Sequence, residues 1–406
     1  MSSLSFSPIS KNLTKNIGKV EKKTQGIYFT PPNIVTSMIE RCLDLNHPIK
    51  RVLEPSCGSC EVINGLEKIY KNIVIDGIEY NNTIFSEIKG LKYNNTVTLQ
   101  HLDYLQYSPV EKYDLIIGNP PYFVLPKKKV DKKYYPYFNG RPNIFLLFII
   151  KALDELKERG ILAFVLPKSF MNCYYYNKLR THIVNKYTIV DITDHSAAKY
   201  IDTGQDTIVF ILRNIRDLTG TNAKFVLRVD ENIIFNTPEN IVKLREYRVG
   251  ATSLGALKFE VSVGNVVWNQ VKPLLSNDVD KTRLIYSSDI VNNALSIKKY
   301  KNLEKKNYIE KKGSTELLLV VNRGYGKGTY KFSYCLIDTD KPYLVENHLI
   351  CLRSVDKMSR PLLLEKYKKI ILSLQSEKTR EFITNYFGNN AINTKELRDI
   401  IPIYIE

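Results

Sequence analysis

Four short apolar runs, each ending in an acidic residue or a turn, constrain the fold more than any other feature of this chain. They are RVLEP (51–55), VIDGIEY (74–80), TLQHLDY (98–104) and YDLIIGNPPY (113–122). Helix-length segments separate the first three, and a turn around Ser108-Pro109 precedes the fourth. Alternating strands and helices are typical of an α/β fold with a doubly wound parallel sheet. Such sheets bind ligands at the carboxyl ends of their strands, where these acidic and asparagine residues fall.

The same rhythm continues to about residue 214 and then breaks. An amphipathic helix is expected over NIFLLFIIKALDELKERG (143–160), and strands over ILAFVLP (161–167), YTIVDITD (187–194) and DTIVFILRN (206–214). Beyond this point short strands and scattered helices show no βα alternation. We therefore expect an α/β domain over 26–220 and a second domain of mixed α+β structure over 221–406.

The N-terminal residues 1–25 are polar and basic and lack the apolar core of a secretory signal, so they are expected to form a flexible tail. The following stretch, TPPNIVTSMIERCLDL, predicts a helix because Thr30 can serve as the N-cap and prolines suit a first helical turn.

The charge of the chain points to a polyanionic partner. The formal net charge is +17 over 406 residues, and the pI is near 9.3. Nucleic acid is the favoured partner, with a lysine-biased genome as the alternative explanation. No run reaches the roughly 18 apolar residues of a membrane span. The six cysteines form no disulfide pattern, which indicates a reducing compartment.

A C-x-x-C sequence, Cys57-Gly58-Ser59-Cys60, lies directly after the first predicted strand. A redox dithiol would need a thioredoxin-like domain, which nothing else here supports. A four-cysteine zinc site would need a second pair at short spacing, and no such pair is present. The position is instead that of a ligand-binding loop, in which Gly58 lets the backbone approach a bound molecule closely.

The segment Asn119-Pro120-Pro121-Tyr122 follows an apolar strand, and its prolines fix a rigid turn. An amino group conjugated to an aromatic ring is a poor nucleophile. The amide oxygen of Asn119 and the carbonyl of Pro120 can accept its two hydrogens and draw the nitrogen toward tetrahedral geometry. Tyr122 offers a flat face for a planar substrate. The alternative is an ordinary turn with a packed tyrosine, but the position at the end of the fourth strand favours function.

The site of the electrophile is expected at the neighbouring strand ends. The loop after the first strand supplies Glu54, Pro55, Ser56, Cys57 and Gly58. Glu79 ends the second strand, where a carboxylate can bind both hydroxyls of a ribose. Asp103, beside Tyr104, ends the third and can accept a hydrogen bond from an adenine amino group. Phe148 can stack on that adenine, although a core phenylalanine fits its position nearly as well.

These motifs resemble the γ-class of adenine-N6 DNA methyltransferases, in the order of that class. GIYFTPPNIVTSMI is similar to its motif X, LEPSCGSCE to motif I, VIDGIEY to motif II, LDY to motif III and GNPPY to motif IV. The resemblance covers about the first 210 residues and implies S-adenosylmethionine as the cofactor. It places Thr30 and Glu54 near the methionine end, Glu79 at the ribose, and Asp103 and Phe148 at the adenine. Cys60 departs from the pattern, because many relatives have glycine there.

Two further segments extend the resemblance. KYIDTGQDTIVFIL is similar to motif VIII, which implies that Tyr200 stacks against the flipped adenine. The C-terminal half shows a weaker similarity to the target-recognition region of PstI-like enzymes. Polar candidates for contacts with bases there are Arg323, Lys327, Asn347 and His348. His348 is equally consistent with a core histidine.

The expected function is site-specific methylation of adenine N6 in double-stranded DNA by a monomer, in the compartment that holds the DNA, with a separate cognate restriction endonuclease as a functional partner. One alternative keeps the chemistry but acts on RNA or a protein glutamine amide. The long region after the catalytic motifs argues against it. A catalytically dead DNA-binding module would be expected to lose Asn119, Tyr122 or the acidic strand ends. A fused endonuclease would need more chain than the two regions leave.

Overall fold

The computed structural model describes residues 5–198, 200–324, 330–386 and 391–405, which form two compact units. The first unit runs to residue 228 and includes 233–241, and the second comprises 229–232 and 242 onward. The boundary expected after residue 220 is therefore too early. The segment beyond it stays with the first unit because Phe225 and Phe235 are buried in its core, where the Phe235 ring stacks on Phe210 at 5.8 Å.

A seven-stranded sheet forms the centre of the first unit, with strand order β3-β2-β1-β4-β5-β7-β6. The strands are β1 (Arg51–Glu54), β2 (Val74–Glu79), β3 (Thr96–His101), β4 (Tyr113–Gly118), β5 (Leu156–Pro167), β6 (Thr188–Asp194) and β7 (Thr207–Arg213). The predicted Rossmann-like α/β fold is confirmed. The expectation of a wholly parallel sheet is wrong for β7, which runs antiparallel to both neighbours. The connection from β6 to β7 carries no helix among its described residues, so it makes a hairpin and not a crossover.

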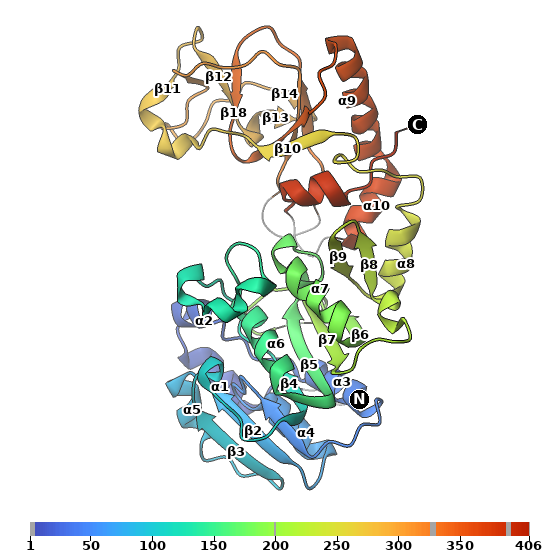
Figure 1. The fold of residues 1–406 in the computed structure, drawn as a ribbon. Helices are drawn as coiled ribbons and strands as arrows, with labels where there is room; N and C mark the ends of the chain where they lie inside the picture. The colour runs from blue at the N-terminus through green and yellow to red at the C-terminus, as the bar shows by residue number, and fades with distance from the viewer. Residues whose placement is uncertain (1–4, 199, 325–329, 387–390, 406) are drawn as a thin grey trace. The chain divides into compact units, whose positions relative to one another are not determined.

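Alternating side chains of the strands face two different cores. In β4, Leu115 and Ile117 pack with α3 (Pro32–Leu43), α4 (Glu61–Ile69) and α5 (Asn82–Ile88) on one face of the sheet. Ile116 faces the opposite core, which is covered by α6 (Ile144–Glu155) and α7 (Asn177–Lys186). Figure 1 shows α6 and α7 lying over the sheet. Burial on both faces explains why these strands read as continuous apolar runs.

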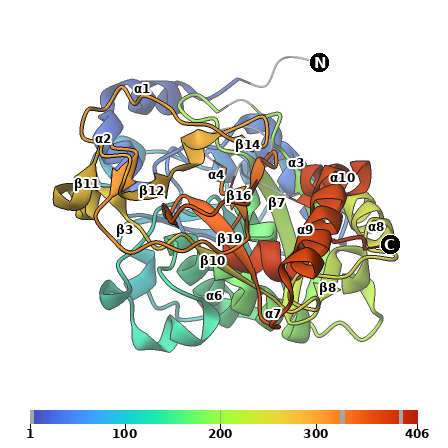
Figure 2. The same ribbon diagram turned by 90° about the horizontal axis from the view of Figure 1, so that it is seen from above.

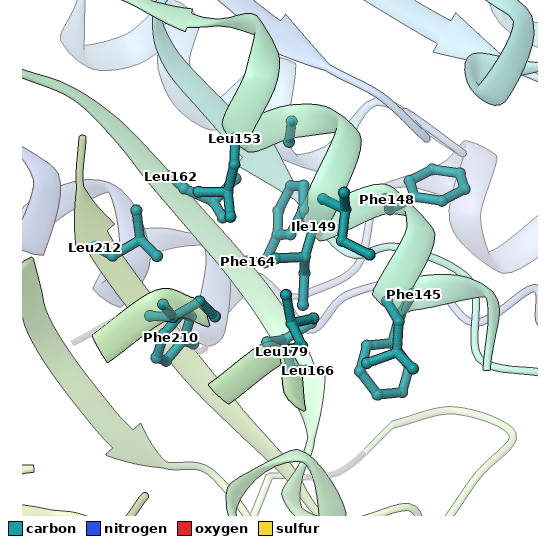
Figure 3. Close-up of a cluster of buried hydrophobic side chains, with 14 of the residues drawn as sticks. Phe145, Phe148, Ile149, Leu153, Leu162, Phe164, Leu166, Leu179, Phe210 and Leu212 are labelled. Carbon is teal, nitrogen blue, oxygen red and sulfur yellow. The ribbon is translucent and has the colours of Figure 1, made fainter. Parts of the chain in front are cut away.

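The helix predicted over residues 143–160 ends at Glu155, and β5 begins at Leu156. The helix cannot continue because Leu156 is extended and pairs with Tyr113 of β4, and Arg159 has a left-handed φ of 64°. Figure 3 shows α6 side chains packed against those of β5, β7 and α7. The labelled residues are Phe145, Phe148, Ile149, Leu153, Leu162, Phe164, Leu166, Leu179, Phe210 and Leu212.

The N-terminal segment is not the flexible tail that its sequence suggests. From residue 8 it forms α1 (Pro8–Asn16) and α2 (Lys19–Gln25). Leu13 and Ile17 are buried against Ile84 of α5. The start of α3 also differs from expectation, since Pro31 is its N-cap and Thr30 is buried one residue earlier.

The second unit has the mixed α+β structure that was expected. One four-stranded sheet has the order β10 (Phe259–Val263), β19 (Leu349–Ser354), β16 (Leu318–Asn322), β17 (Tyr334–Ile337). Another has the order β11 (Leu275–Ser276), β15 (Tyr308–Ile309), β12 (Thr282–Ile285), β18 (Tyr343–Val345). A short pair, β13 (Ile290–Val291) with β14 (Ala294–Leu295), also belongs to this unit. The pair β8 (Val226–Val229) with β9 (Asn232–Phe235) lies mostly in the first unit, and α8 (Pro238–Glu246) begins in the first unit and ends in the second.

Two helices, α9 (Arg360–Gln375) and α10 (Glu377–Tyr386), complete this unit. Figure 2 shows α9 beside β10 and β19. Tyr367 connects α9 to both strands. Its ring lies 5.7 Å from that of Phe259 in β10, and its hydroxyl donates to the Leu352 carbonyl of β19 at 2.7 Å. None of the helices in the described part of the chain is long and apolar enough to span a bilayer.

The packing of α1 predicts that the N-terminal segment contributes to stability. Leu13→Ala removes a side chain that is 1% exposed, so we expect the free energy of unfolding to fall by about 2–3 kcal/mol. Val20→Ala, at a position 78% exposed on α2, is the control and should change it by less than about 0.5 kcal/mol. Urea denaturation followed by circular dichroism measures both. If neither variant changed the free energy of unfolding, the N-terminal segment would not contribute to stability, and the prediction would be wrong.

Candidate active site

A cavity of about 450 Å³ opens at the carboxyl ends of β1 to β4. This volume is within the range of small-molecule and cofactor sites. The cavity brings together most of the residues that the sequence indicates for the electrophile. Its lining includes Pro55, Ser56, Gly58, Glu79, Asp103, Tyr104, Asn119, Pro121 and Phe148.

The loop after β1 and the end of β2 are joined at the wall of this cavity. Gly58 adopts a left-handed φ of 51°, and its N–H donates to Glu79 Oε2 at 2.9 Å. The other oxygen of Glu79 accepts the Asn81 N–H at 2.6 Å. Burial raises the pKa of Glu79, although the N–H groups of Asn81 and Gly58 oppose the rise. The carboxylate is therefore held in one orientation at the cavity.

The end of β3 and helix α6 form the adjoining wall. Asp103 Oδ1 accepts the Leu105 N–H at 2.9 Å, which fixes the carboxylate beside the cavity. The Tyr104 ring lies 4.8 Å from the Phe148 ring, and the Tyr104 hydroxyl donates to Glu155 Oε2 at 2.7 Å. Phe148 is buried in the core of Figure 3, as one interpretation of its sequence position expects, and it also lines the cavity.

Thr30, Glu54 and Cys57 line a smaller pocket of about 30 Å³, which shares Ser56, Gly58 and Asn119 with the large cavity. Glu54 is 2% exposed, and its Oε2 has no hydrogen-bond partner within the described chain. Burial raises the pKa of Glu54 well above its ordinary value, and the Cys60 thiol adds to the rise. A buried carboxylate oxygen without a partner is costly, so this atom is suited to a cationic ligand group.

The two cysteines of this loop are buried free thiols. The pKa of Cys57 is raised by its hydrogen bond with Cys60 and by burial, so it is not a reactive thiolate. Cys60 is the N-cap of α4 and has a left-handed φ of 62°. Glycine adopts this conformation without strain, so the backbone accounts for a preference for glycine at this position, and Cys60 occupies it at a cost. The described residues contain no cluster of metal-ligating side chains.

The Asn119 side chain is fixed at both of its polar atoms. Its Nδ2 donates to the Tyr28 carbonyl at 3.1 Å, and its Oδ1 accepts from the Tyr122 hydroxyl at 2.6 Å. The Tyr122 hydroxyl also lies 2.8 Å from the Val165 carbonyl oxygen. A phenol has a single proton, so Tyr122 can donate to only one of these two acceptors at a time. Pro120 is buried and lines none of the cavities described here.

A second cavity, of about 300 Å³, borders the Asn-Pro-Pro-Tyr segment at its tyrosine. Tyr122 and Tyr200 both line it, and the Tyr200 hydroxyl donates to Thr207 Oγ1 at 3.2 Å. Burial and the nearby Tyr200 raise the pKa of Tyr122 well above its ordinary value, and burial raises that of Tyr200 to about 12. Both tyrosines are therefore neutral aromatic walls. Tyr28 and Phe123 line this cavity and the large one, so the two are neighbours.

Sequence reasoning missed several residues of the site. Tyr28 lines both cavities and the small pocket. It lies within GIYFTPP, in which the sequence pattern indicated only Thr30 as a site residue. Gly26 has a φ of 67°, and a Cβ added there would lie 2.6 Å from the Tyr122 nitrogen. Its place as the first residue of GIYFTPP is the only sequence signal for Gly26. Lys23 and Gln205, which line the second cavity, had none.

Of the four polar candidates for base contacts in the second unit, the structure describes Arg323, Asn347 and His348. Lys327 lies outside the described residues. His348 Nδ1 is 2.5 Å from Glu346 Oε1, and its side chain is 43% exposed, so it is not a core histidine. Burial, Arg323 and Lys305 lower the pKa of His348. Asn347 Oδ1 is buried without a hydrogen-bond partner in the described chain.

The strain at Cys60 predicts an unusual order of stability. Cys60→Gly and Cys60→Ala both lose the buried thiol, but only glycine adopts the left-handed conformation freely. We expect the glycine variant to have the higher free energy of unfolding, by about 1 kcal/mol. Urea denaturation of the two variants side by side measures the difference. An alanine variant at least as stable as the glycine variant would contradict it.

The burial of Glu54 predicts a pH dependence. A raised pKa means that the folded chain holds this proton more tightly than the unfolded chain, so ionisation of Glu54 destabilises the fold as pH rises above the ordinary value of 4.5. Without ligand, Glu54→Gln should therefore be more stable than the parent at about pH 8, with the difference shrinking toward about pH 4. Urea denaturation at both pH values tests this, with exposed Glu87→Gln as control. A pH-independent difference would refute the assignment.

Comparisons with known proteins agree with this arrangement. The model of the Eco57I restriction-modification methylase family matches residues 59–200, from the loop after β1 to Tyr200. The chain is 27% identical over 409 residues to the type II methyltransferase M.CvrRI of Paramecium bursaria Chlorella virus XZ-6E, covering 98% of this chain and 99% of the relative. It is 28% identical, with the same coverage, to the modification methylase CviBIII of Paramecium bursaria Chlorella virus NC1A.

The fold is also found in a solved structure that matches most of the chain. The cryoEM structure of a DrdV–DNA complex matches with a TM-score of 0.50 at 15% identity, covering 98% of this chain and 57% of that one, and it supports the fold. The family match and the full-length relatives together support a methyltransferase of the restriction-modification type.

Proposed function

We propose that this chain transfers a methyl group from S-adenosylmethionine to N6 of an adenine that is flipped out of double-stranded DNA at a specific site. The observation that carries the proposal is that residues of the Asn-Pro-Pro-Tyr segment line two neighbouring cavities. Asn119 lines the large cavity, and Tyr122 lines the second one together with Tyr200. A methyl donor in the first and an acceptor base in the second would meet at Asn119.

The residues of the large cavity and the small pocket fit the cofactor. The unpartnered Glu54 Oε2 suits the ammonium of the methionine end, next to Thr30. Glu79 is oriented to bind ribose hydroxyls, and Asp103 to accept from the adenine amino group, with Phe148 as a stacking surface. Pro55, Ser56 and Gly58 let the backbone approach the ligand. When bound, S-adenosylmethionine supplies an electrophilic methyl group on a sulfonium.

The chain's own groups prepare the acceptor nitrogen. We assign the Asn119 amide oxygen and, from the motif resemblance, the Pro120 carbonyl as acceptors of the two N–H hydrogens of the exocyclic amine, which frees its lone pair for attack. Pro120 lines none of the described cavities, so its carbonyl takes part only after a local rearrangement. Tyr122 can release Asn119 Oδ1 by turning its proton to the Val165 carbonyl, which lies within reach. The bond from Asn119 Nδ2 to Tyr28 holds the amide in place during this exchange. No strong general base is required, because the alkylated ammonium is acidic.

Tyr122 and Tyr200 provide the aromatic surfaces that offset the cost of unstacking the base, which is a few kcal/mol. The net charge of +17 matches a duplex, because phosphate contacts dominate affinity for DNA. We assign target recognition to the second unit, with Arg323, Asn347 and His348 as candidates for base contacts. The full-length similarity to restriction-modification methyltransferases favours DNA over RNA or a protein amide as substrate. We expect the protein to act as a monomer, with a separate restriction enzyme as its functional partner.

The central test is Asn119→Ala. The variant should lose methyl transfer by a factor of about 10² or more, because the developing charge on nitrogen loses a fixed dipole. Its affinity for S-adenosylmethionine should remain within about threefold of the parent, since the other cavity residues are unchanged. Labelled cofactor and plasmid DNA give the rate, and single-molecule sequencing maps the modified base. Lys157→Met, at the opposite edge of the sheet, is the activity control. A fully active Asn119→Ala, or modification of a base other than adenine, would sink the proposal.

A further inference from the structure

The helix pair α1–α2 contacts the loops that form both cavities. Ser10 Oγ and Ser59 Oγ are 2.7 Å apart, which joins α1 to the loop after β1. Asn81 Nδ2, at the end of β2, donates to Glu21 Oε1 at 2.8 Å and to Gln25 Oε1 at 2.9 Å. The segment predicted as a tail is therefore built into the site.

One contact of this helix pair reaches the loop that carries Tyr200. Lys22 Nζ lies 2.6 Å from Asp202 Oδ2, with side chains 8% and 35% exposed. The ammonium also donates to the Thr14 carbonyl oxygen of α1. A small pocket is lined by Lys22 and Asp202 together with Tyr200 and Tyr28. A lysine this deeply buried is uncommon without a partner, and its partner here is two residues from Tyr200.

The loop needs such a contact. Residues 195–206 connect β6 to β7, and the described ones form neither helix nor strand. Within the described part of this loop, side chains of residues 200–204 make two polar contacts with the rest of the first unit. These are the Lys22–Asp202 pair and the 3.2 Å hydrogen bond from Tyr200 to Thr207. Without the ion pair, the Tyr200–Thr207 bond and the packing of Tyr200 against the core remain, but no side chain of the described residues 201–204 makes a polar contact outside the loop.

We propose that Lys22 is a positioning residue, which holds the loop through Asp202 so that Tyr200 faces Tyr122 across the second cavity. This rests on the proposed function, because it makes that cavity the site of the flipped base. Lys22 acts on the acceptor side alone. It does not line the large cavity, whereas its neighbours Gln25 and Gly26 do.

The test uses the full chain and the variants Lys22→Met and Asp202→Asn, with Lys157→Met as the matched control. Lys157 also makes an ion pair, with Asp114 at 2.9 Å, but at the opposite edge of the sheet. Hydrogen exchange without ligand should become about tenfold faster in residues 195–206 for the first two variants, because a hydrogen bond to a charged group contributes this much or more. The control should leave exchange in this loop unchanged.

The second readout is base flipping. With 2-aminopurine in place of the target adenine, the fluorescence increase on binding should be lost or strongly reduced in Lys22→Met and Asp202→Asn. The affinity for S-adenosylmethionine should stay within about threefold of the parent in both, since the cofactor residues are untouched. Asp202→Glu, which keeps the charge, should restore most of the signal. The double variant should be no worse than either single variant, because both remove the same contact.

Two results would overturn the proposal. One is loop exchange in Lys22→Met equal to that in Lys157→Met. The other is an unchanged 2-aminopurine signal in a variant whose loop exchanges faster. Failure of the proposed function is seen separately, as absence of adenine methylation by the parent protein, and the exchange measurement still decides whether Lys22 holds the loop.

Discussion

The hydrogen bond from Asn119 Nδ2 to the Tyr28 carbonyl oxygen joins the two segments on which the rest of the site depends. One segment leaves the sheet at the end of β4 because two prolines end the strand there. The other comes from the N-terminal part of the chain, 91 residues earlier. Where they meet, Asn119 is directed to the large cavity and Tyr122 to the second one. Both cavities therefore depend on these two segments, because residues of each segment line both of them.

The strand order explains the order in which the cofactor candidates appear along the wall, which differs from their order in the sequence. Since β1 lies between β2 and β4, the loop with Gly58 is central, with Glu79 and then Asp103 on one side and Asn119 on the other. Each lies at the end of a parallel strand or within four residues after it, so a single edge of the sheet collects them. Small shifts in strand register would therefore change the spacing of the whole set, and burial of both faces opposes such shifts.

Much of this arrangement follows from local sequence. The apolar runs of β1 to β6, the polar residues that end them and the Asn-Pro-Pro-Tyr turn are local patterns, and they led to the correct strands. Contacts between distant segments could not be read in this way. Lys22 meets Asp202 across 180 residues, and Gly26 approaches Tyr122 only in the folded chain. Helices as short as α1 and α2 are not stable alone, so a polar sequence gave no sign that Leu13 would be buried. The direction of β7 depended on the hairpin before it, which apolar content does not reveal.

The close approach of Gly26 to Tyr122 has a consequence for how this chain can vary. Every other residue type adds a Cβ, which would lie 2.6 Å from a backbone nitrogen, and the φ of 67° adds strain for each of them. Neither difficulty can be relieved by choosing a smaller or more polar side chain. Six residues earlier, Val20 is largely exposed and can change with little effect. Between the first turn of α2 and the glycine that caps its end, the chain thus passes from a position open to substitution to one where any other residue type is strained.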